Sequence, residues 1–414
     1  MPIKGVINLP GDKSISHRAL MLASLTDGEC LIHNLSTGED VETTRNCLFQ
    51  CGIKSSKEGT TVHIKGGPFK TPEKALDCGN SGTSVRLLAG LLAGRGISAV
   101  FKGDESLSKR PMKRIIDPLR ELGVEIESRN ECLPLKIIPH ILTGITYTSP
   151  VASAQVKSSI LLAGLGAVGA TTVLEDVKTR DHTELMLMEL GAQIAVTEKI
   201  LIQSLQNPLN TFEMTIPGDP SSAAFFGAAA AMLPNSDITI KNILANPTRI
   251  SFFSVLEKMG AGFELMNMRK ECGEWVGDIH IFSQPLNGID ITKEMVPSII
   301  DELPIIAVLA SQADSPTTVS GAEELRVKES DRINAICLNL ANMGCEVIER
   351  KDGFIINPVN SMLHTSIKTF GDHRIAMAFI IAGLLTPERN ILDDEQCINI
   401  SFPGFNTILD RILK

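Results

Sequence analysis

The chain has 414 residues, of which 43% are hydrophobic and 21% charged, a composition typical of a globular protein long enough for two domains. The net charge of −9 and the 4% aromatic content argue against nucleic acid as a partner. Nine cysteines without a C-x-x-C pair favour reduced thiols. The N-terminus lacks the apolar core of a secretory signal, and the apolar runs are too short to span a membrane, so a cytoplasmic location is expected.

An internal repeat organises the chain. The stretch "LPGDKSISHRALMLA" at Leu9 is echoed by "IPGDPSSAAFFGAAA" at Ile216, half a chain length later. Within each half, helices rich in Ala, Leu and Gly recur after a small or polar turn, and their apolar character all round predicts burial. These helices begin near Lys13, Asn80, Ser153, Asp219, Asp301 and Asp372.

A second type of helix alternates with the first. A short β-like run leads through a polar loop into an amphipathic helix, which ends at a glycine where a left-handed cap is expected. The glycines, of which the first four recur at intervals of about 70 residues, are Gly52, Gly123, Gly191, Gly260 and Gly344. Each repeat therefore reads strand, helix, strand, helix, strand, strand. The pattern predicts an α/β (α+β) fold of two similar domains, each built from three βαβαββ repeats with buried helices.

Two matching turns separate the halves of the chain. They are Pro10-Gly11-Asp12 and Pro217-Gly218-Asp219. We expect an N-terminal domain of residues 13–218 and a C-terminal domain of residues 1–12 and 219–414, with the active site in the cleft between them. Two bodies joined at glycine turns suit a hinged pair.

Cations and hydroxyl groups gather at the equivalent helix starts. Helix N-termini attract anions, and Lys or Arg placed there opposes the helix dipole, so these cations favour ligand binding over stability. Neutral hydrogen bonds are expected from Ser14, Thr83, Ser153 and Gln155, and positive charge from Lys13, Arg110, Lys328, Arg332 and Arg374. Asp301 and Glu329 remain as carboxylates for proton transfer. The ligand should carry several negative charges.

Two familiar cofactor signals do not fit. The stretch "GLGAVG" at residues 164–169 matches G-x-G-x-x-G, but it follows a helix and precedes a strand, the reverse of a dinucleotide site. His17, His182 and His373 lack metal-ligand spacing. We therefore expect neither a cofactor nor a metal.

With these residues in view, the chain resembles the enolpyruvyl transferases, and most closely those that act on shikimate 3-phosphate. The motifs are "LPGDKSISHRALMLASL", "DCGNSGTSVRLLAGLLAG", "KRPM", "SAQVKSSILLAGL", "DELPIIAVLASQA", "ELRVKESDRI" and "GDHRIAMAF", in order from residue 9 to residue 379. The resemblance implies the inside-out barrel fold of that family and a place in the shikimate pathway, which leads to chorismate and the aromatic amino acids. It also implies a monomer that works without cofactor, nucleic acid or membrane.

The resemblance further implies a reaction and its residues. The 5-hydroxyl of shikimate 3-phosphate attacks phosphoenolpyruvate, and the tetrahedral adduct loses phosphate to give 5-enolpyruvylshikimate 3-phosphate. Asp301 would take the hydroxyl proton, with Glu329 and Lys13 as candidates for proton transfer at C3. Shikimate 3-phosphate would bind Lys13, Ser14, Arg18, Ser153, Ala154, Gln155, Thr179, Asp301 and Lys328. Phosphoenolpyruvate would bind Lys13, Gly82, Arg110, Gln155, Arg332 and Arg374.

Two positions differ from the pattern of the family, and three alternative functions have to be weighed against the one that the resemblance implies. Ile400 stands where some members carry a phosphate-binding Lys, and Ala154 where others have Ser. UDP-N-acetylglucosamine enolpyruvyl transferase is the alternative, but it uses a loop cysteine, and the stretch "KGDESLSK" before Arg110 has none. An RNA 3′-phosphate cyclase should show a catalytic His and a basic surface. A non-catalytic anion-binding protein would not need Asp301 and Glu329.

Overall fold

The computed structural model describes residues 1–413, which fall into two compact units. The N-terminal unit comprises Gly11–Ile216 together with Lys270–Glu274. The C-terminal unit comprises Met1–Pro10, Pro217–Arg269 and the residues from Trp275 onward. The short segment 270–274 is a feature that the repeat pattern did not suggest.

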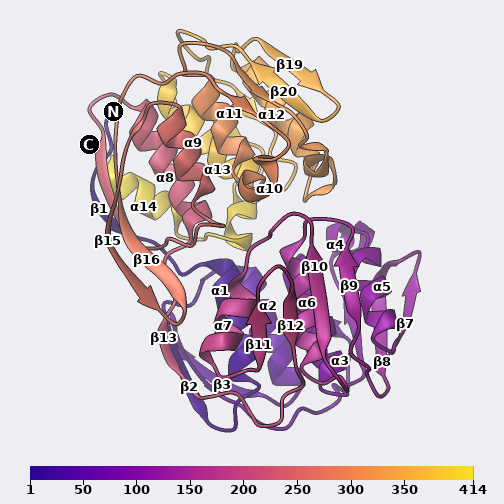
Figure 1. The fold of residues 1–414 in the computed structure, drawn as a ribbon. Helices are drawn as coiled ribbons and strands as arrows, with labels where there is room; N and C mark the ends of the chain where they lie inside the picture. Colours follow the sequence, from indigo (N-terminus) through magenta and orange to yellow (C-terminus); the bar gives the residue numbers. More distant parts are fainter. Residues whose placement is uncertain (414) are drawn as a thin grey trace. The chain divides into compact units, whose positions relative to one another are not determined.

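The N-terminal unit repeats one arrangement of strands and helices three times (Figure 1). Its first repeat contains α1 (Lys13–Ala23), β2 (Glu29–His33), α2 (Glu39–Gln50), β3 (Lys54–Glu58) and β4 (Thr61–Lys65). The second contains β5 (Leu76–Asp77), α3 (Gly82–Gly94), β6 (Ala99–Lys102), α4 (Glu105–Lys109), α5 (Lys113–Glu121), β7 (Val124–Arg129) and β8 (Cys132–Pro139). The third contains β9 (Thr146–Ser149), α6 (Ala154–Gly164), β10 (Thr171–Glu175), α7 (His182–Glu189), β11 (Ile194–Val196), β12 (Ile200–Ile202) and β13 (Glu213–Thr215).

The C-terminal unit repeats the same arrangement. It begins with β1 (Lys4–Asn8), α8 (Pro220–Met232), β14 (Asp237–Leu244), α9 (Ser251–Lys258), β15 (Gly262–Glu271) and β16 (Glu274–Phe282). The next repeat contains β17 (Asp290–Ile291), α10 (Val296–Ile299), α11 (Leu303–Ala310), β18 (Thr317–Val319), η1 (Glu323–Val327), α12 (Arg332–Asn342), β19 (Val347–Arg350) and β20 (Gly353–Ile356). The last contains β21 (Ser366–Ile367), α13 (His373–Ala382), η2 (Gly383–Leu385), β22 (Ile391–Leu392), η3 (Gln396–Ile400) and α14 (Phe405–Ile412).

The sheets show that the repeats are structural copies. The four-stranded sheets run β13-β2-β4-β3, β5-β6-β8-β7, β9-β10-β12-β11, β1-β14-β16-β15 and β17-β18-β20-β19, and the last repeat keeps only the pair β21-β22. The first two strands of each order are parallel, as in β9 with β10. The third strand is antiparallel to the second, as in β10 with β12.

Two strands pair with strands that lie far away from them in the sequence. Strand β1 pairs in parallel with β14, where Val6 lies opposite Thr239. Strand β13 pairs in parallel with β2, where Met214 lies opposite Ile32. Each four-stranded sheet that follows one of the matching turns is therefore completed by a strand from another part of the chain.

The starts of the apolar helices follow from their capping residues. Asp12 Oδ1 accepts a hydrogen bond of 2.8 Å from the backbone N–H of Ile15. Ser81, Ser153, Asp219 and Asp372 cap α3, α6, α8 and α13 in the same way. These side chains satisfy backbone donors that a helix start leaves open.

The glycines after the amphipathic helices adopt the backbone conformation expected of them. Gly52, Gly123, Gly191, Gly260 and Gly344 have φ between 87° and 106°. A residue with a Cβ adopts such angles only with strain, which explains why the chain carries glycine there.

The apolar helices form the cores, as predicted. In α1, every residue from Ile15 to Ala23 is buried, and α11 is buried along its whole length. Helices α3 and α6 pack closely, since a Cβ atom at Gly90 would lie 2.1 Å from the backbone oxygen of Ser159. Within residues 1–413, no helix combines the length and hydrophobicity needed to cross a membrane.

Candidate active site

The start of α1 presents one cation at the surface and one inside. Lys13 Nζ lies 3.1 Å from Asp40 Oδ2, and the Lys13 side chain is partly exposed. Ser14 lies beside it at the same helix start. Its backbone oxygen accepts a hydrogen bond of 2.9 Å from Nη1 of Arg18, one turn further along. The three residues predicted to bind at this helix start are therefore adjacent.

Arg18 is held from three sides although only 4% of it is exposed. Its Nε donates to Thr183 Oγ1 and its Nη2 to Ser158 Oγ, both at 2.7 Å. Burial lowers the pKa of Arg18 to about 10, partly offset by the charge of Glu184. Arg18 is therefore still a cation at neutral pH, with its orientation set by α6 and α7.

The starts of α3 and α6 bring four predicted residues into contact. Gln155 Nε2 donates to Thr83 Oγ1 at 3.0 Å, and Gln155 Oε1 accepts from Arg86 Nη1 at 2.7 Å. A Cβ atom at Gly82 would lie 2.8 Å from Arg86 Nη1 and 3.6 Å from Arg110 Nη1. Glycine at position 82 therefore lets two guanidinium groups approach the backbone. This position is suited to an anion.

The remaining predicted residues of this unit lie at the start of α6 and after β10. Ser153 caps α6, and Ala154 is its first residue. Thr179 lies in the loop between β10 and α7, where its Oγ1 donates to Glu175 Oε1 at 2.5 Å. Arg86, which lies in α3 and donates to Gln155 Oε1, was not among the predicted ligand-binding residues.

In the C-terminal unit, Arg332 is the centre of a charged cluster. It is 1% exposed, its Nη2 donates to Glu329 Oε2 at 2.7 Å, and its Nη1 lies 3.5 Å from Asp301 Oδ1. Asp372, which is fully buried, accepts from Arg332 Nε at 2.7 Å. Arg374 Nη1 donates to the backbone oxygen of Asp301 at 2.9 Å. The structure therefore groups three predicted residues, Asp301, Glu329 and Arg374, with the buried cation Arg332, which was predicted as well.

The electrostatics of the cluster favour its charged form. Burial by itself lowers the pKa of Arg332, but the carboxylates of Asp372 and Glu329 outweigh this and raise it above its usual value. Burial likewise opposes ionisation of Asp372, and Arg332 overcomes it, so the pKa of Asp372 is lowered. Nη1 of Arg332 is buried and has no hydrogen-bond acceptor among residues 1–413. It is a donor suited to an anionic oxygen.

Two further positions named in the sequence analysis belong to the same unit. Lys328 Nζ lies 3.7 Å from Glu324 Oε1, a surface ion pair. Ile400 is partly buried against the apolar core of the unit and supplies no charge there.

The start of α8 repeats the sequence pattern of the α1 start, and there Arg249 neutralises the charge of the capping residue Asp219. Arg249 Nη2 lies 3.0 Å from Asp219 Oδ1 and 3.1 Å from Ser221 Oγ, and Ser221 Oγ donates to Glu302 Oε1 at 2.5 Å. Here a cation from the chain itself occupies the helix start.

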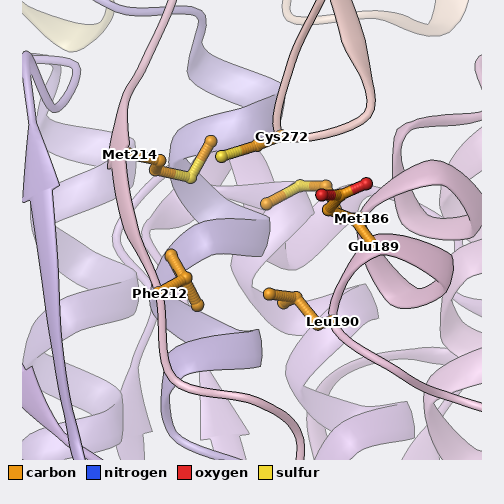
Figure 2. A pocket seen from close by; sticks show the side chains of 6 residues that line it. All are labelled: Met186, Glu189, Leu190, Phe212, Met214 and Cys272. Atoms are coloured by element: carbon orange, nitrogen blue, oxygen red, sulfur yellow. The ribbon is translucent and has the colours of Figure 1, made fainter.

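A small apolar pocket in the N-terminal unit offers no competing site. Its lining residues are Met186, Glu189, Leu190, Phe212, Met214 and Cys272, and Figure 2 shows their mostly apolar side chains around it. None of them is a predicted site residue. In the described part of the chain, no group of His, Cys, Asp or Glu has an arrangement that could hold a metal ion.

Comparison with known proteins places these features in one family. The family model of EPSP synthase (3-phosphoshikimate 1-carboxyvinyltransferase) matches residues 1–409. A 3-phosphoshikimate 1-carboxyvinyltransferase from Sulfurihydrogenibium sp. (strain YO3AOP1) is 44% identical over 422 aligned positions, covering 100% of this chain and 98% of the relative. One from Thermoanaerobacter sp. (strain X514) is 43% identical, covering 99% of this chain and 98% of the relative.

Solved structures agree. EPSP synthase from Acinetobacter baumannii has a TM-score of 0.89 and 39% identity, covering 99% of this chain and 96% of that one. The enolpyruvyl transferase NikO from Streptomyces tendae has a TM-score of 0.79 at 17% identity, covering 99% and 95%, and so shares the fold alone. The predicted fold class is confirmed.

Proposed function

Because the chain belongs to the EPSP synthase family, we propose that the two residue groups described above act on one pair of substrates, shikimate 3-phosphate and phosphoenolpyruvate. The reaction is transfer of the enolpyruvyl group to the 5-hydroxyl of shikimate 3-phosphate, with release of phosphate. The predicted function is thus confirmed, and UDP-N-acetylglucosamine as the alternative acceptor is not favoured. The shared cleft between domains stays a prediction.

The acceptor is assigned mainly to the starts of α1 and α6. Arg18 is a buried cation with a fixed orientation, and Ser153, Ala154 and Thr179 supply neutral donors nearby in the fold. A phosphate monoester suits such a mixture of one firm cation and several hydrogen-bond donors. The full proposed set is Lys13, Ser14, Arg18, Ser153, Ala154, Gln155, Thr179, Asp301 and Lys328.

The donor is assigned to guanidinium groups from both units. Phosphoenolpyruvate carries a phosphate and a carboxylate, and Arg binds each of these with two parallel hydrogen bonds. The single observation that carries this assignment is the buried Nη1 of Arg332, which has no hydrogen-bond acceptor in the described chain. The full proposed set is Lys13, Gly82, Arg110, Gln155, Arg332 and Arg374.

The chemistry needs one base and one acid. Asp301 accepts the proton of the 5-hydroxyl as its oxygen attacks C2 of phosphoenolpyruvate, while Glu329 or Lys13 donates a proton to C3. The tetrahedral adduct then breaks its C–O bond to phosphate and returns a proton from C3. Arg332 holds Glu329 at 2.7 Å and Asp301 at 3.5 Å, so one cation orders both carboxylates.

The remaining expectations stay proposals. We expect a cytoplasmic location, since all nine cysteines are free thiols and seven of them are buried, as suits a reducing compartment. A monomer is expected from the family resemblance. No cofactor, nucleic acid or membrane partner is required by the proposed steps.

The test is a pair of substitutions, one in each unit. Arg110→Lys and Arg374→Lys each lose a two-pronged contact, so each should raise the KM of phosphoenolpyruvate about tenfold, the scale of one charged hydrogen bond. Arg389→Lys is the control, because Arg389 is half-exposed and pairs with Asp410 at the surface. If only one unit's variant changed this KM, the assignment of the donor to both groups would be wrong.

A further inference from the structure

Lys157 is a fully enclosed cation that the proposed chemistry does not use. It lies on α6 and is 2% exposed. Its Nζ lies 2.8 Å from Glu175 Oε2 and 2.7 Å from Glu184 Oε1, and both carboxylates are largely buried. A buried ion network of this kind is costly to desolvate and is strongly destabilised when one partner is removed. Its position next to the acceptor residues therefore calls for an explanation.

The two carboxylates stand at the two ends of one loop. Glu175 is the last residue of β10, and Glu184 lies in the first turn of α7. The loop between them, residues 176–181, carries Thr179. Lys157 Nζ donates to the backbone oxygen of Thr179 at 3.4 Å, and Thr179 Oγ1 donates to Glu175. Lys157 thus joins both ends of the loop and its middle.

The same contact aligns the groups that hold Arg18. Ser158 follows Lys157 on α6, and Thr183 precedes Glu184 on α7; their hydroxyl oxygens lie 2.7 Å apart. Arg18 donates to both of these hydroxyls. The ion pair of Lys157 with Glu184 therefore fixes α6 against α7 at the level where Arg18 is bound.

Charge gives the lysine a second effect. Without Lys157, two buried carboxylates would stand beside the proposed phosphate-binding residues and repel an anion. Burial raises the pKa of Glu184, and the charge of Lys157 opposes that rise. Lys157 thus offsets the negative charge of Glu175 and Glu184 close to where the phosphate of shikimate 3-phosphate is proposed to bind.

We infer that Lys157 is a positioning residue for shikimate 3-phosphate. Its contacts with Glu175, Glu184 and the backbone oxygen of Thr179 hold loop 176–181 against α6, and thereby orient Thr179 and Arg18 toward the acceptor. This inference rests on the proposed acceptor-binding roles of those two residues. Lys157 touches neither substrate nor reacting atoms in this scheme. Its substitution should therefore change acceptor affinity and leave the chemical step largely intact.

The first test is Lys157→Met, which keeps the length of the side chain and removes the charge. The KM of shikimate 3-phosphate should rise about 10-fold to 100-fold, the scale seen when outer-shell partners of a ligand site are removed. The kcat and the KM of phosphoenolpyruvate should change less than about threefold, because both are measured with shikimate 3-phosphate at saturation, where weaker binding of the acceptor no longer limits the rate. Lys57→Met is the control, since Lys57 pairs with Glu42 at the surface of the same unit. Equal KM values for wild type and Lys157→Met would overturn the inference.

A double variant separates positioning from stability. Lys157→Met leaves two buried carboxylates with no lysine, and Lys157→Met combined with Glu184→Gln removes one of those charges. We expect the thermal midpoint to recover in the double variant while the KM of shikimate 3-phosphate stays raised, because the contacts of Lys157 with loop 176–181 are still missing. If this KM recovered together with the midpoint, Lys157 would serve stability alone and the inference would fail.

Two more variants complete the test. If Lys157→Met does not fold, Glu175→Gln replaces it, because one amide oxygen cannot accept from both Lys157 and Thr179 as the carboxylate does. An unchanged KM of shikimate 3-phosphate in the folded Glu175→Gln variant overturns the positioning role of Lys157. Thr179→Ala tests the premise. An unchanged KM of shikimate 3-phosphate in Thr179→Ala overturns the acceptor-binding role proposed for Thr179. A raised KM in Thr179→Ala together with an unchanged KM in Lys157→Met overturns the positioning role of Lys157 alone.

Discussion

Arg332 and Asp372 form an ion pair in which neither side chain is more than 1% exposed, with Arg332 Nε 2.7 Å from Asp372 Oδ2. Asp372 also accepts from Ser330 Oγ at 3.1 Å and caps α13 through the backbone N–H of Arg374 at 2.9 Å. One carboxylate therefore fixes a proposed donor-binding arginine, the loop beside Glu329 and the start of the helix that carries Arg374. A buried pair of this kind gives little net stability, so its position beside the site is its more informative property.

Asp372→Asn should impair catalysis while α13 still forms. Asparagine is as good a helix cap as aspartate, so α13 should still begin at His373, while Arg332 loses a counter-charge and its fixed orientation. We expect kcat/KM for phosphoenolpyruvate to fall about 10-fold to 100-fold. The control is Asp331→Asn, which alters the cap of α12 in the same unit. Because asparagine also caps α12, Asp331→Asn should keep kcat/KM near the wild-type value. An equal loss in the two variants would show that the loss does not come from the pair of Asp372 with Arg332.

Asp301→Asn and Glu329→Gln should separate binding from chemistry. Both changes keep the shape of the side chain and remove its ability to exchange a proton, so turnover should fall about 10²-fold to 10⁴-fold. Binding of shikimate 3-phosphate, measured by calorimetry, should stay within about tenfold of wild type. Glu349→Gln is the control, because Glu349 pairs with Arg326 at the surface. Unchanged turnover in either site variant would contradict the role proposed for that carboxylate.

Gly90→Ala should destabilise the contact between α3 and α6. Alanine normally favours a helix over glycine by about 1 kcal/mol, but here its Cβ would lie 2.1 Å from the backbone oxygen of Ser159. We expect the free energy of unfolding to fall by about 1–3 kcal/mol, as in other overpacked cores. Gly227→Ala in α8 is the matched control, since its Cβ would meet the flexible end of Ile281 at 2.9 Å. Denaturant unfolding that ranked Gly227→Ala as the more damaging change would refute this packing argument.

His17 should make stability depend on pH. It is fully buried with Nδ1 2.7 Å from Thr44 Oγ1, and burial, followed by the charges of Lys13 and Arg18, holds its pKa well below the usual value. Between the lowered value and about 6.5, the unfolded chain binds one proton more than the folded chain, so stability falls as pH falls through this range. The expected slope is up to about 1.4 kcal/mol per pH unit.

His17→Asn should remove that part of the pH dependence. Asparagine places an amide near the position of Nδ1 and does not titrate. Unfolding free energies measured between pH 7 and pH 5 should therefore vary less in this variant than in wild type. His63→Asn, at an exposed position, should keep the wild-type slope. Identical slopes for wild type and His17→Asn would mean that His17 is not the titrating group.

The repeat made much of the fold predictable. Apolar periodicity and turn residues are local signals, so the starts expected near Lys13, Asn80 and Ser153 agree with α1, α3 and α6 within about two residues, within the usual uncertainty of helix ends. The glycines expected to end the amphipathic helices all have positive φ. Local pattern and global fold agree here, as they do in stable natural sequences.

The partners of the site residues were not predictable in the same way. Asp372 was recognised as a turn residue, but its contact joins it to Arg332, 40 positions earlier. Arg18 meets Thr183 across 165 positions, and Lys157 meets its carboxylates only once α6, β10 and α7 have packed. The place of the separate segment 270–274 in the N-terminal unit also depends on tertiary contacts. A sequence pattern shows which positions are unusual for stability, and the fold then shows what each one contacts.

Phosphate release from phosphoenolpyruvate, measured with each of two acceptors, tests the reaction itself. With shikimate 3-phosphate we expect steady turnover and an enolpyruvyl ether at the 5-hydroxyl, detectable by mass spectrometry. With UDP-N-acetylglucosamine we expect no release above background, because the loop before Arg110 lacks the cysteine on which that enzyme relies. Release with the UDP-sugar and none with shikimate 3-phosphate would contradict the assigned reaction.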